Sequence, residues 1–185
     1  MLAFNMRPTC RHQEIAANPE VRQANSISAK NAMNAPRLEV DNILDAARDR
    51  GRKKSLTYAG EVTPHEAHQL FVAAGAKIID VRYHFEHEYI GRIPGSMWIP
   101  WKLAPGGDVN PDFLPALRQH CARDDVVLFL CRSGVRSHAA AALASEAGFT
   151  RTMNILEGFE GNLDAGLQRG NTGGWRCAGL PWIQS

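Results

Sequence analysis

The sequence predicts an α/β protein with a mostly parallel sheet of five strands and helices on both faces. Apolar, strand-like segments alternate along the chain with segments of helical periodicity, which is typical of crossovers between parallel strands. Segments 126–130 and 78–81 are mostly apolar without polar alternation, as expected of central strands buried on both faces. Helix-capping residues mark several boundaries and define the order of the elements.

Composition sets residues 1–36 apart from the rest of the chain. They are rich in Asn, Ala and Ser and lack sustained periodicity, so we predict a disordered extension. A start-site artefact is an alternative, because Met33 could begin translation. A targeting segment is a third interpretation, because the stretch holds three arginines. Against it, two glutamates interrupt the stretch, and no apolar h-region is present.

Residues 37–56 are predicted to form a helix and a basic linker. Asp41 is a good N-cap, apolar residues recur at helical spacing, and Gly51 is expected to end the helix. Residues 57–185 are predicted to form the α/β domain. There Thr63 is expected to cap a helix that Gly75 ends. Strands are expected at 58–62, 78–81, 97–99, 126–130 and 152–156, and helices at 63–75, 84–89, 111–120, 137–147 and 161–167.

Overall composition is that of an ordinary globular protein, with 44% hydrophobic and 22% charged residues among 185. A formal net charge of +2 gives no reason to expect a nucleic-acid or membrane partner. No apolar run reaches membrane-spanning length. Cys10, Cys121, Cys131 and Cys177 are scattered without a C-x-x-C pair, which argues against a disulfide framework or zinc site and favours a reducing, cytoplasmic compartment.

Cys131 is the most informative residue. It leaves an apolar strand and opens a short loop before a predicted helix, where the helix dipole and unpaired N–H groups favour a thiolate. Arg132 and Arg136 add positive potential for an anionic substrate. Gly134 permits a backbone nest for an anion, and Ser133 and Ser137 can donate hydrogen bonds to sulfur, Ser137 being also a candidate helix cap. The whole loop reads Cys131-Arg132-Ser133-Gly134-Val135-Arg136-Ser137.

The alternative interpretation is a structural strand-to-helix turn with a buried cysteine. Such a turn has no need of two arginines, two hydroxyls and a thiol in seven positions, so we favour a catalytic loop. Neither of the common glycine-rich nucleotide motifs is present.

The chain resembles the rhodanese family in three stretches that occur in the family's order. The Cys131 loop is similar to the family's active-site loop. The family's upstream signature is resembled by Asp80-Val81-Arg82, followed by Glu86 or Glu88 and then by Gly91-Arg92-Ile93-Pro94-Gly95-Ser96. A common C-terminal segment of the family is resembled by the closing stretch, Trp175-Arg176-Cys177-Ala178-Gly179-Leu180-Pro181-Trp182.

This resemblance implies a rhodanese-like fold and a ping-pong sulfurtransferase. Cys131 would attack the outer sulfur of thiosulfate or a similar donor and carry it as a persulfide, which a thiol, cyanide or protein acceptor would then remove. Backbone N–H groups from Arg132 to Ser137 would hold the persulfide, and Arg132 or Arg136 would steer the donor. No metal or organic cofactor is implied.

Two rival functions stay open at this stage. The first is a phosphatase or an arsenate-reductase-like thiol enzyme. Phosphatases of the same fold use a loop one residue longer, with C-x5-R spacing. Here Arg136 follows Cys131 at C-x4-R spacing, which favours a sulfur substrate over a phosphate. A non-catalytic regulatory module is the other, although the intact cysteine disfavours it. The chain departs from the family in having Arg92 where His is common and Phe159 after Gly158.

Other residues are weaker candidates. Asp80 and Arg82 are expected to form a structural ion pair near the site rather than an acid–base pair. His84 and His87 lack a third metal ligand. Trp101 is a candidate for the substrate rim, His138 for the pocket wall, and Cys177 for a resolving thiol.

Overall fold

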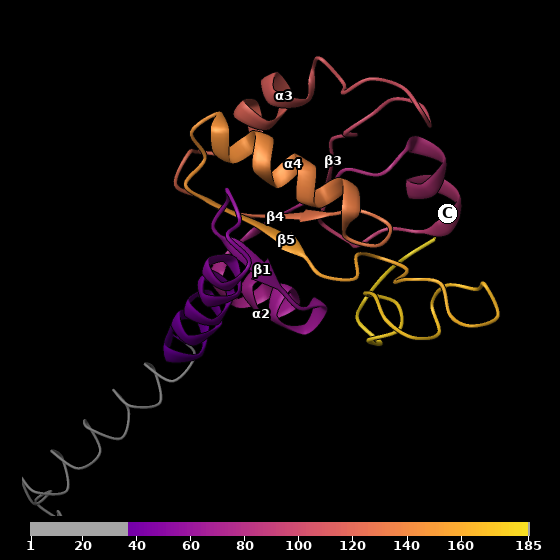
Figure 1. The fold of residues 1–185 in the computed structure, drawn as a ribbon, viewed down its shortest axis with the longest axis horizontal. Helices are drawn as coiled ribbons and strands as arrows, with labels where there is room; N and C mark the ends of the chain where they lie inside the picture. Colours follow the sequence, from indigo (N-terminus) through magenta and orange to yellow (C-terminus); the bar gives the residue numbers. More distant parts are fainter. Residues whose placement is uncertain (1–36, 185) are drawn as a thin grey trace, which may run out of the picture. The chain divides into compact units, whose positions relative to one another are not determined.

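A computed structural model describes residues 37–184. Its centre is one sheet of five strands, all parallel, in the order β1-β5-β4-β2-β3 (Figure 1). The predicted α/β class and parallel sheet are therefore confirmed. The strands are β1 (Gly60–Val62), β2 (Lys77–Asp80), β3 (Met97–Trp98), β4 (Val126–Leu130) and β5 (Arg151–Ile155).

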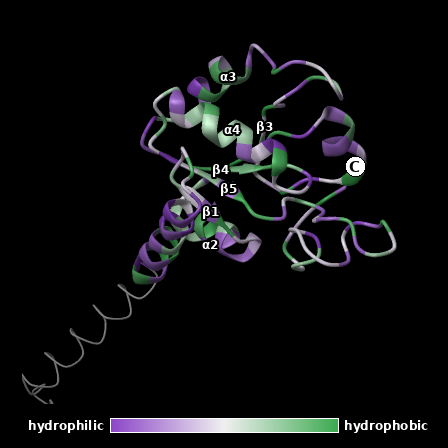
Figure 2. Cartoon of the chain, in the orientation of Figure 1, coloured by the Kyte–Doolittle hydropathy of each residue, from purple (hydrophilic) through white to green (hydrophobic). Residues whose placement is uncertain are grey.

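Helices cover both faces of the sheet, as predicted (Figure 1). Residues 37–53 are helical and pack with α2 (Pro64–Ala74) against one face, while α3 (Phe113–His120) and α4 (Val135–Glu146) cover the other. Each face has its own apolar cluster, and Figure 2 shows the middle of α4 in the green of apolar residues. Because β4 and β2 contribute side chains to both clusters, they are buried on both sides and form a rigid base for the loops that follow them.

The N-terminus of α2 forms as predicted. Thr63 Oγ1 accepts from the Glu66 N–H, Glu66 accepts in return from the Thr63 N–H at 2.8 Å, and Pro64 is the first helical residue. At the other end Gly75 adopts a left-handed conformation with φ of 64°. This reciprocal capping satisfies donors that would otherwise lack partners in the first turn.

Gly51 does not end the first helix, which continues to residue 53, and Asp41 is not its N-cap, because residues 37–40 are already helical. Its role is close packing, because a Cβ at Gly51 would lie 2.8 Å from the Ala59 carbonyl oxygen and 3.0 Å from the Gly60 Cα. A Cβ at Gly60 would in turn clash with the Ala47 carbonyl. Glycine at both positions thus lets the helix lie directly against the start of β1. Ile43 and Leu44 belong to the same apolar cluster as α2, so this helix is part of the compact unit formed by Leu38–Ser185.

Two further local predictions were wrong. Residues 161–167 form turns instead of a helix, because Asp164 Oδ1 accepts backbone N–H groups from Gly166 and Gln168 and replaces helical bonds. The short helix predicted at 84–89 does form, with residues 84–85 helical and Glu86–Ile90 as a five-residue π-helix. Helix α4 begins at Val135 with Gly134 as its N-cap, so Ser137 lies within the first turn and is not the cap.

The predictions for residues 1–36 lie outside the described residues. Within residues 37–184, no helix combines the length and the apolar character needed to cross a membrane.

Candidate active site

The candidate site lies at the carboxyl edge of the sheet. Cys131 directly follows β4, and the register pairs Leu130 with Asp80 at the end of β2. The Val81 N–H continues this pairing by donating to the Leu130 carbonyl at 2.8 Å. The two central strands therefore deliver Cys131 and the segment after Asp80 to one edge, where ligands bind in open parallel sheets.

The Cys131 sulfur is buried, with only 1% of the residue exposed, and it lies within a cradle of donors. The Gly134 N–H donates to Sγ at 3.1 Å, and Ser137 Oγ lies 3.2 Å from the same sulfur. Gly134 has φ of 94°, which turns its N–H inward and would strain any residue with a side chain. The loop and the first turn of α4 therefore converge on the sulfur from two sides.

The carbonyl groups of the loop are held away from the sulfur by the segment after β5. Phe159 N–H donates to the Cys131 carbonyl at 2.8 Å, and Glu160 N–H donates to the Arg132 carbonyl at 2.9 Å. Gly158 makes this approach feasible, because a Cβ there would lie 2.7 Å from the Ser133 nitrogen. With the carbonyls engaged, several loop N–H groups have no acceptor within residues 37–184; they belong to Arg132, Ser133, Val135, Arg136 and Ser137.

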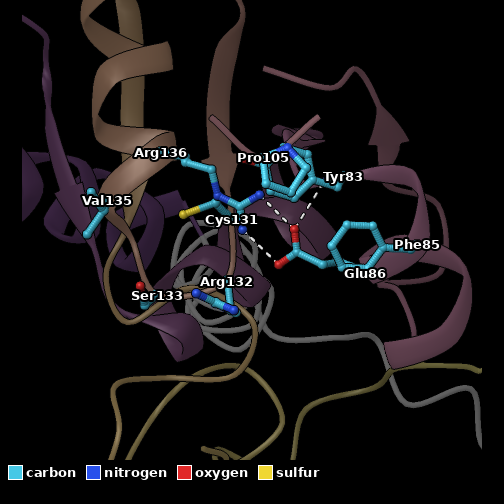
Figure 3. Close-up of a pocket in the computed structure, with 9 residues that line it drawn as sticks. All are labelled: Tyr83, Phe85, Glu86, Pro105, Cys131, Arg132, Ser133, Val135 and Arg136. Atoms are coloured by element: carbon cyan, nitrogen blue, oxygen red, sulfur yellow. Dashed lines mark hydrogen bonds and ion pairs between the residues drawn. The ribbon is translucent and has the colours of Figure 1, made fainter. Parts of the chain in front are cut away.

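Arg136 is engaged by a carboxylate. Its guanidinium donates to both oxygens of Glu86, each at 2.7 Å, and lies 4.5 Å from the centroid of the Tyr83 ring. Figure 3 shows the Glu86 carboxylate between Arg136 and the Tyr83 backbone, whose N–H donates to it at 3.1 Å. Burial alone would raise the pKa of Glu86, but the hydrogen bonds and charge of Arg136 outweigh it and lower that pKa. The pair therefore stays ionised and largely neutralises itself.

A cavity of about 470 Å³ opens beside the Cys131 loop (Figure 3). Arg132 lines it, is exposed, and has no acidic partner among the described residues. Because Arg136 is paired with Glu86, Arg132 is the cation left available to an anionic ligand. The lining comprises Tyr83, Phe85, Glu86, Pro105, Cys131, Arg132, Ser133, Val135 and Arg136.

Asp80 and Arg82 form a fully buried ion pair beneath this edge. Arg82 Nη2 lies 2.6 Å from Asp80 Oδ2 and also donates to the Gly91 carbonyl at 2.7 Å. Its guanidinium carbon lies 4.1 Å from the centroid of the Phe159 ring. Neither charged residue lines the cavity. The pair connects β2 to the segments around Gly91 and Phe159 and so supports the Cys131 loop.

Trp101 lies in the core below the cavity and does not line it. It is 7% exposed and packs edge-on against Phe113, with ring centroids 5.2 Å apart. Pro105, from the loop beyond it, lines the cavity instead. Cys121 is buried, and Cys177 is exposed.

Several residues at the site are not singled out by the sequence. Tyr83, Phe85 and Pro105 come from irregular segments that carry no motif of their own. Asn154 had a usable signal, because it is a polar residue inside the otherwise apolar end of β5. It is 3% exposed, and its Oδ1 accepts from Ser137 Oγ at 2.7 Å.

The chain belongs to the rhodanese family, since the family model of the rhodanese-like domain matches residues 63–164. It resembles the crystal structure of Rv0390 from M. tuberculosis, with 41% sequence identity and a TM-score of 0.62. That match covers 69% of this chain and 99% of the other.

Among curated proteins, the chain is similar to a thiosulfate sulfurtransferase, number 16, a chloroplastic protein of Arabidopsis thaliana. The two are 34% identical over 103 residues, which cover 55% of this chain and 84% of that protein. An uncharacterised protein of Rickettsia rickettsii is 32% identical over 113 residues, covering 58% of this chain and 82% of that one.

Proposed function

We propose that the protein is a sulfurtransferase that carries sulfane sulfur on Cys131. The Cys131 thiolate attacks the outer sulfur of thiosulfate, a new S–S bond forms, and sulfite leaves with the electron pair of the old S–S bond. An acceptor thiolate or cyanide then attacks the outer sulfur of the persulfide and regenerates the Cys131 thiolate. Both steps exchange one bond to sulfur for another, so neither needs a metal, an organic cofactor or an external oxidant.

The observation that carries this proposal is the orientation of the loop around Sγ. Donors converge on the sulfur, while the carbonyls of Cys131 and Arg132 are held by Phe159 and Glu160 on the other side. The unengaged N–H groups of the loop can therefore donate to a persulfide anion. Such a cradle stabilises negative charge on sulfur and provides no general acid, which sulfur transfer does not require.

The state of Arg136 supports sulfur transfer over phosphate-ester hydrolysis. Phosphate chemistry with a cysteine nucleophile uses an arginine as a bidentate clamp on the phosphoryl oxygens. Here both donor arms of Arg136 are occupied by Glu86. A phosphate ester in the cavity would have to displace this carboxylate, whereas thiosulfate can pair with exposed Arg132.

The similarity to a protein named a thiosulfate sulfurtransferase supports the same donor class. The free thiols of Cys121, Cys131 and Cys177 agree with a reducing, cytoplasmic setting, which belongs to the proposal. A low-molecular-weight thiol, cyanide or the thiol of a protein is the proposed acceptor.

Intact-mass spectrometry after incubation with thiosulfate tests the proposal. We expect a gain of one sulfur, about 32 Da, that cyanide or a thiol removes again. Cys131→Ser should abolish the gain. Cys177→Ser serves as the matched control, because it removes an exposed thiol outside the cavity and should leave the gain unchanged.

Two outcomes contradict the proposal. Hydrolysis of a phosphate ester that depends on Cys131, without a sulfur adduct, would identify the phosphatase alternative. Absence of an adduct with thiosulfate and with organic persulfides, in a folded protein, would identify a non-catalytic binding module.

A further inference from the structure

A second cavity, of about 390 Å³, lies on the opposite side of the Cys131 loop. Ser133 and Val135 line both cavities, so this stretch of the loop separates them. Most of the residues that line the second cavity are polar, and Cys131 is not among them. Its lining comprises Glu61, Ser133, Gly134, Val135, His138, Asn154, Leu156, Glu157 and Asn162.

A chain of side-chain hydrogen bonds connects the Cys131 sulfur to this second cavity. Ser137 Oγ lies 3.2 Å from Sγ and 2.7 Å from Asn154 Oδ1. The Asn154 side chain also hydrogen-bonds the Tyr58 hydroxyl, and that hydroxyl lies 2.7 Å from Nδ1 of His138. The three middle residues are buried, whereas His138 is exposed, so the chain runs from the buried sulfur to solvent.

Counting protons shows that the links depend on one another. The Ser137 hydroxyl has one proton, so it can donate either to Cys131 or to Asn154, but not to both. When Ser137 donates to Asn154 Oδ1, the Asn154 amide donates to Tyr58 and Tyr58 donates to His138. His138 must then accept at Nδ1, which requires the neutral ring.

The opposite direction suits a thiolate. Ser137 then donates to the Cys131 sulfur and must accept from the Asn154 amide, which needs a half-turn of the nearly symmetric amide group. Asn154 Oδ1 accepts from Tyr58, and Tyr58 Oη accepts from Nδ1–H of His138. A protonated imidazole is a donor at both nitrogens and therefore favours this direction.

We infer that Tyr58 and His138 are positioning residues that set the direction of the hydrogen bond at Cys131, so that protonated His138 favours the thiolate from the far side of the loop. The inference deepens the proposed function, because it assigns control of the same nucleophile to residues outside the substrate cavity. Neither residue lines that cavity. The coupling needs no movement of the backbone, only reorientation of hydroxyl and amide groups.

The surroundings of both residues fit this role. Burial, followed by the charge of Glu61, raises the pKa of Tyr58, while the Asn154 hydrogen bond opposes them, so the phenol keeps its proton at physiological pH. Glu61 and Glu157 line the second cavity beside His138, and Lys54 pairs with Glu61.

Alkylation of Cys131 by iodoacetamide across pH tests the inference, with peptide mass mapping to separate Cys131 from the other cysteines. Tyr58→Phe keeps the ring and removes the hydroxyl. We expect its half-maximal alkylation to move up by about 0.5 to 1 pH unit, which slows alkylation below the midpoint by about threefold to tenfold. His138→Ala should shift the profile in the same direction.

The variant His138→Asn distinguishes the effect of hydrogen-bond direction on Cys131 from the effect of losing the hydrogen bond to Tyr58. Its amide can occupy the Nδ1 position and bond Tyr58, but it does not titrate. We expect near-wild-type alkylation at high pH together with loss of the inflection that protonation of His138 should give the wild-type profile. His65→Asn, on the exposed face of α2, is the matched control and should leave the profile unchanged.

Superimposable profiles for wild type, Tyr58→Phe and His138→Ala would overturn the inference, as would an equal shift in His65→Asn. His138 is exposed, so its variants keep the test valid even if Tyr58→Phe fails to fold. Alkylation requires no sulfur donor. A protein that forms no persulfide but shows the predicted shifts would therefore refute the proposed function alone.

Discussion

Arg136 and Glu86 are 50 positions apart in the sequence, yet they form a two-armed ion pair with both N–O distances at 2.7 Å. The pair joins the first turn of α4 to the π-helix Glu86–Ile90, so it fixes one wall of the cavity against another. Only 18% of the Arg136 side chain and 4% of the Glu86 side chain are exposed. Removal of the Arg136–Glu86 ion pair should therefore affect both the stability of the protein and the geometry of the site.

We predict that Glu86→Gln lowers the free energy of unfolding by about 2 kcal/mol, because it leaves the partly buried Arg136 charge without its carboxylate. Urea unfolding monitored by circular dichroism measures this. Glu88→Gln is the control, since the Glu88 side chain is 41% exposed and its partner is a histidine on the surface. Equal losses in the two variants would show that the Arg136–Glu86 pair contributes nothing specific.

The same pair predicts a pH dependence of stability. The pKa of Glu86 is lower in the folded protein than in the unfolded chain, because the Arg136 interactions outweigh the effect of burial. Its contribution to stability is thus complete above the unfolded pKa of ~4.3 and is lost as pH falls through the folded pKa. Unfolding free energies between pH 3 and 7 should fall toward acid less steeply in Glu86→Gln. Parallel curves would contradict the assignment.

Arg132 is predicted to govern binding of an anionic donor. Arg132→Ala should raise KM for thiosulfate by about threefold to tenfold with a smaller effect on kcat, because an exposed charge contributes modestly to binding. Arg132→Lys should restore part of the affinity. Steady-state kinetics with cyanide as acceptor measure both constants. An unchanged KM in Arg132→Ala would remove Arg132 from the donor site.

Gly158 is predicted to hold the cysteine loop in its active form. Alanine at this position meets both an unfavourable φ of 63° and a clash with the Cys131 carbonyl. Gly179→Ala is a matched control, because Gly179 has φ of 68° but nothing within 4 Å of a Cβ. Backbone strain should cost the control about 1 kcal/mol. Gly158→Ala should lose more stability and most of its persulfide formation, and similar behaviour of the two variants would refute the role of the clash.

Local sequence was sufficient for most of the sheet and helices. The apolar segment that became β4 has no polar alternation, and Thr63 with Glu66 forms the cap that their spacing predicts. Such features depend on neighbours within a few positions. The prediction failed at residues 161–167, where side-chain bonds from Asp164 to nearby backbone N–H groups outcompete a helix.

The sequence by itself determined that Cys131 follows a buried strand and opens a loop with two arginines before a helix. It did not determine which arginine is available to a ligand. Glu86 comes from a distant segment and pairs with Arg136, which leaves Arg132 available. The same applies to Gly158, which restrains the loop carbonyls, and to Asn154, which connects the sulfur to Tyr58. Contacts between such segments exist only once parallel strands bring their ends to one edge. Tertiary structure therefore decides which charges remain available and how the loop is restrained, whereas the donors from Gly134 and Ser137 to the sulfur are local.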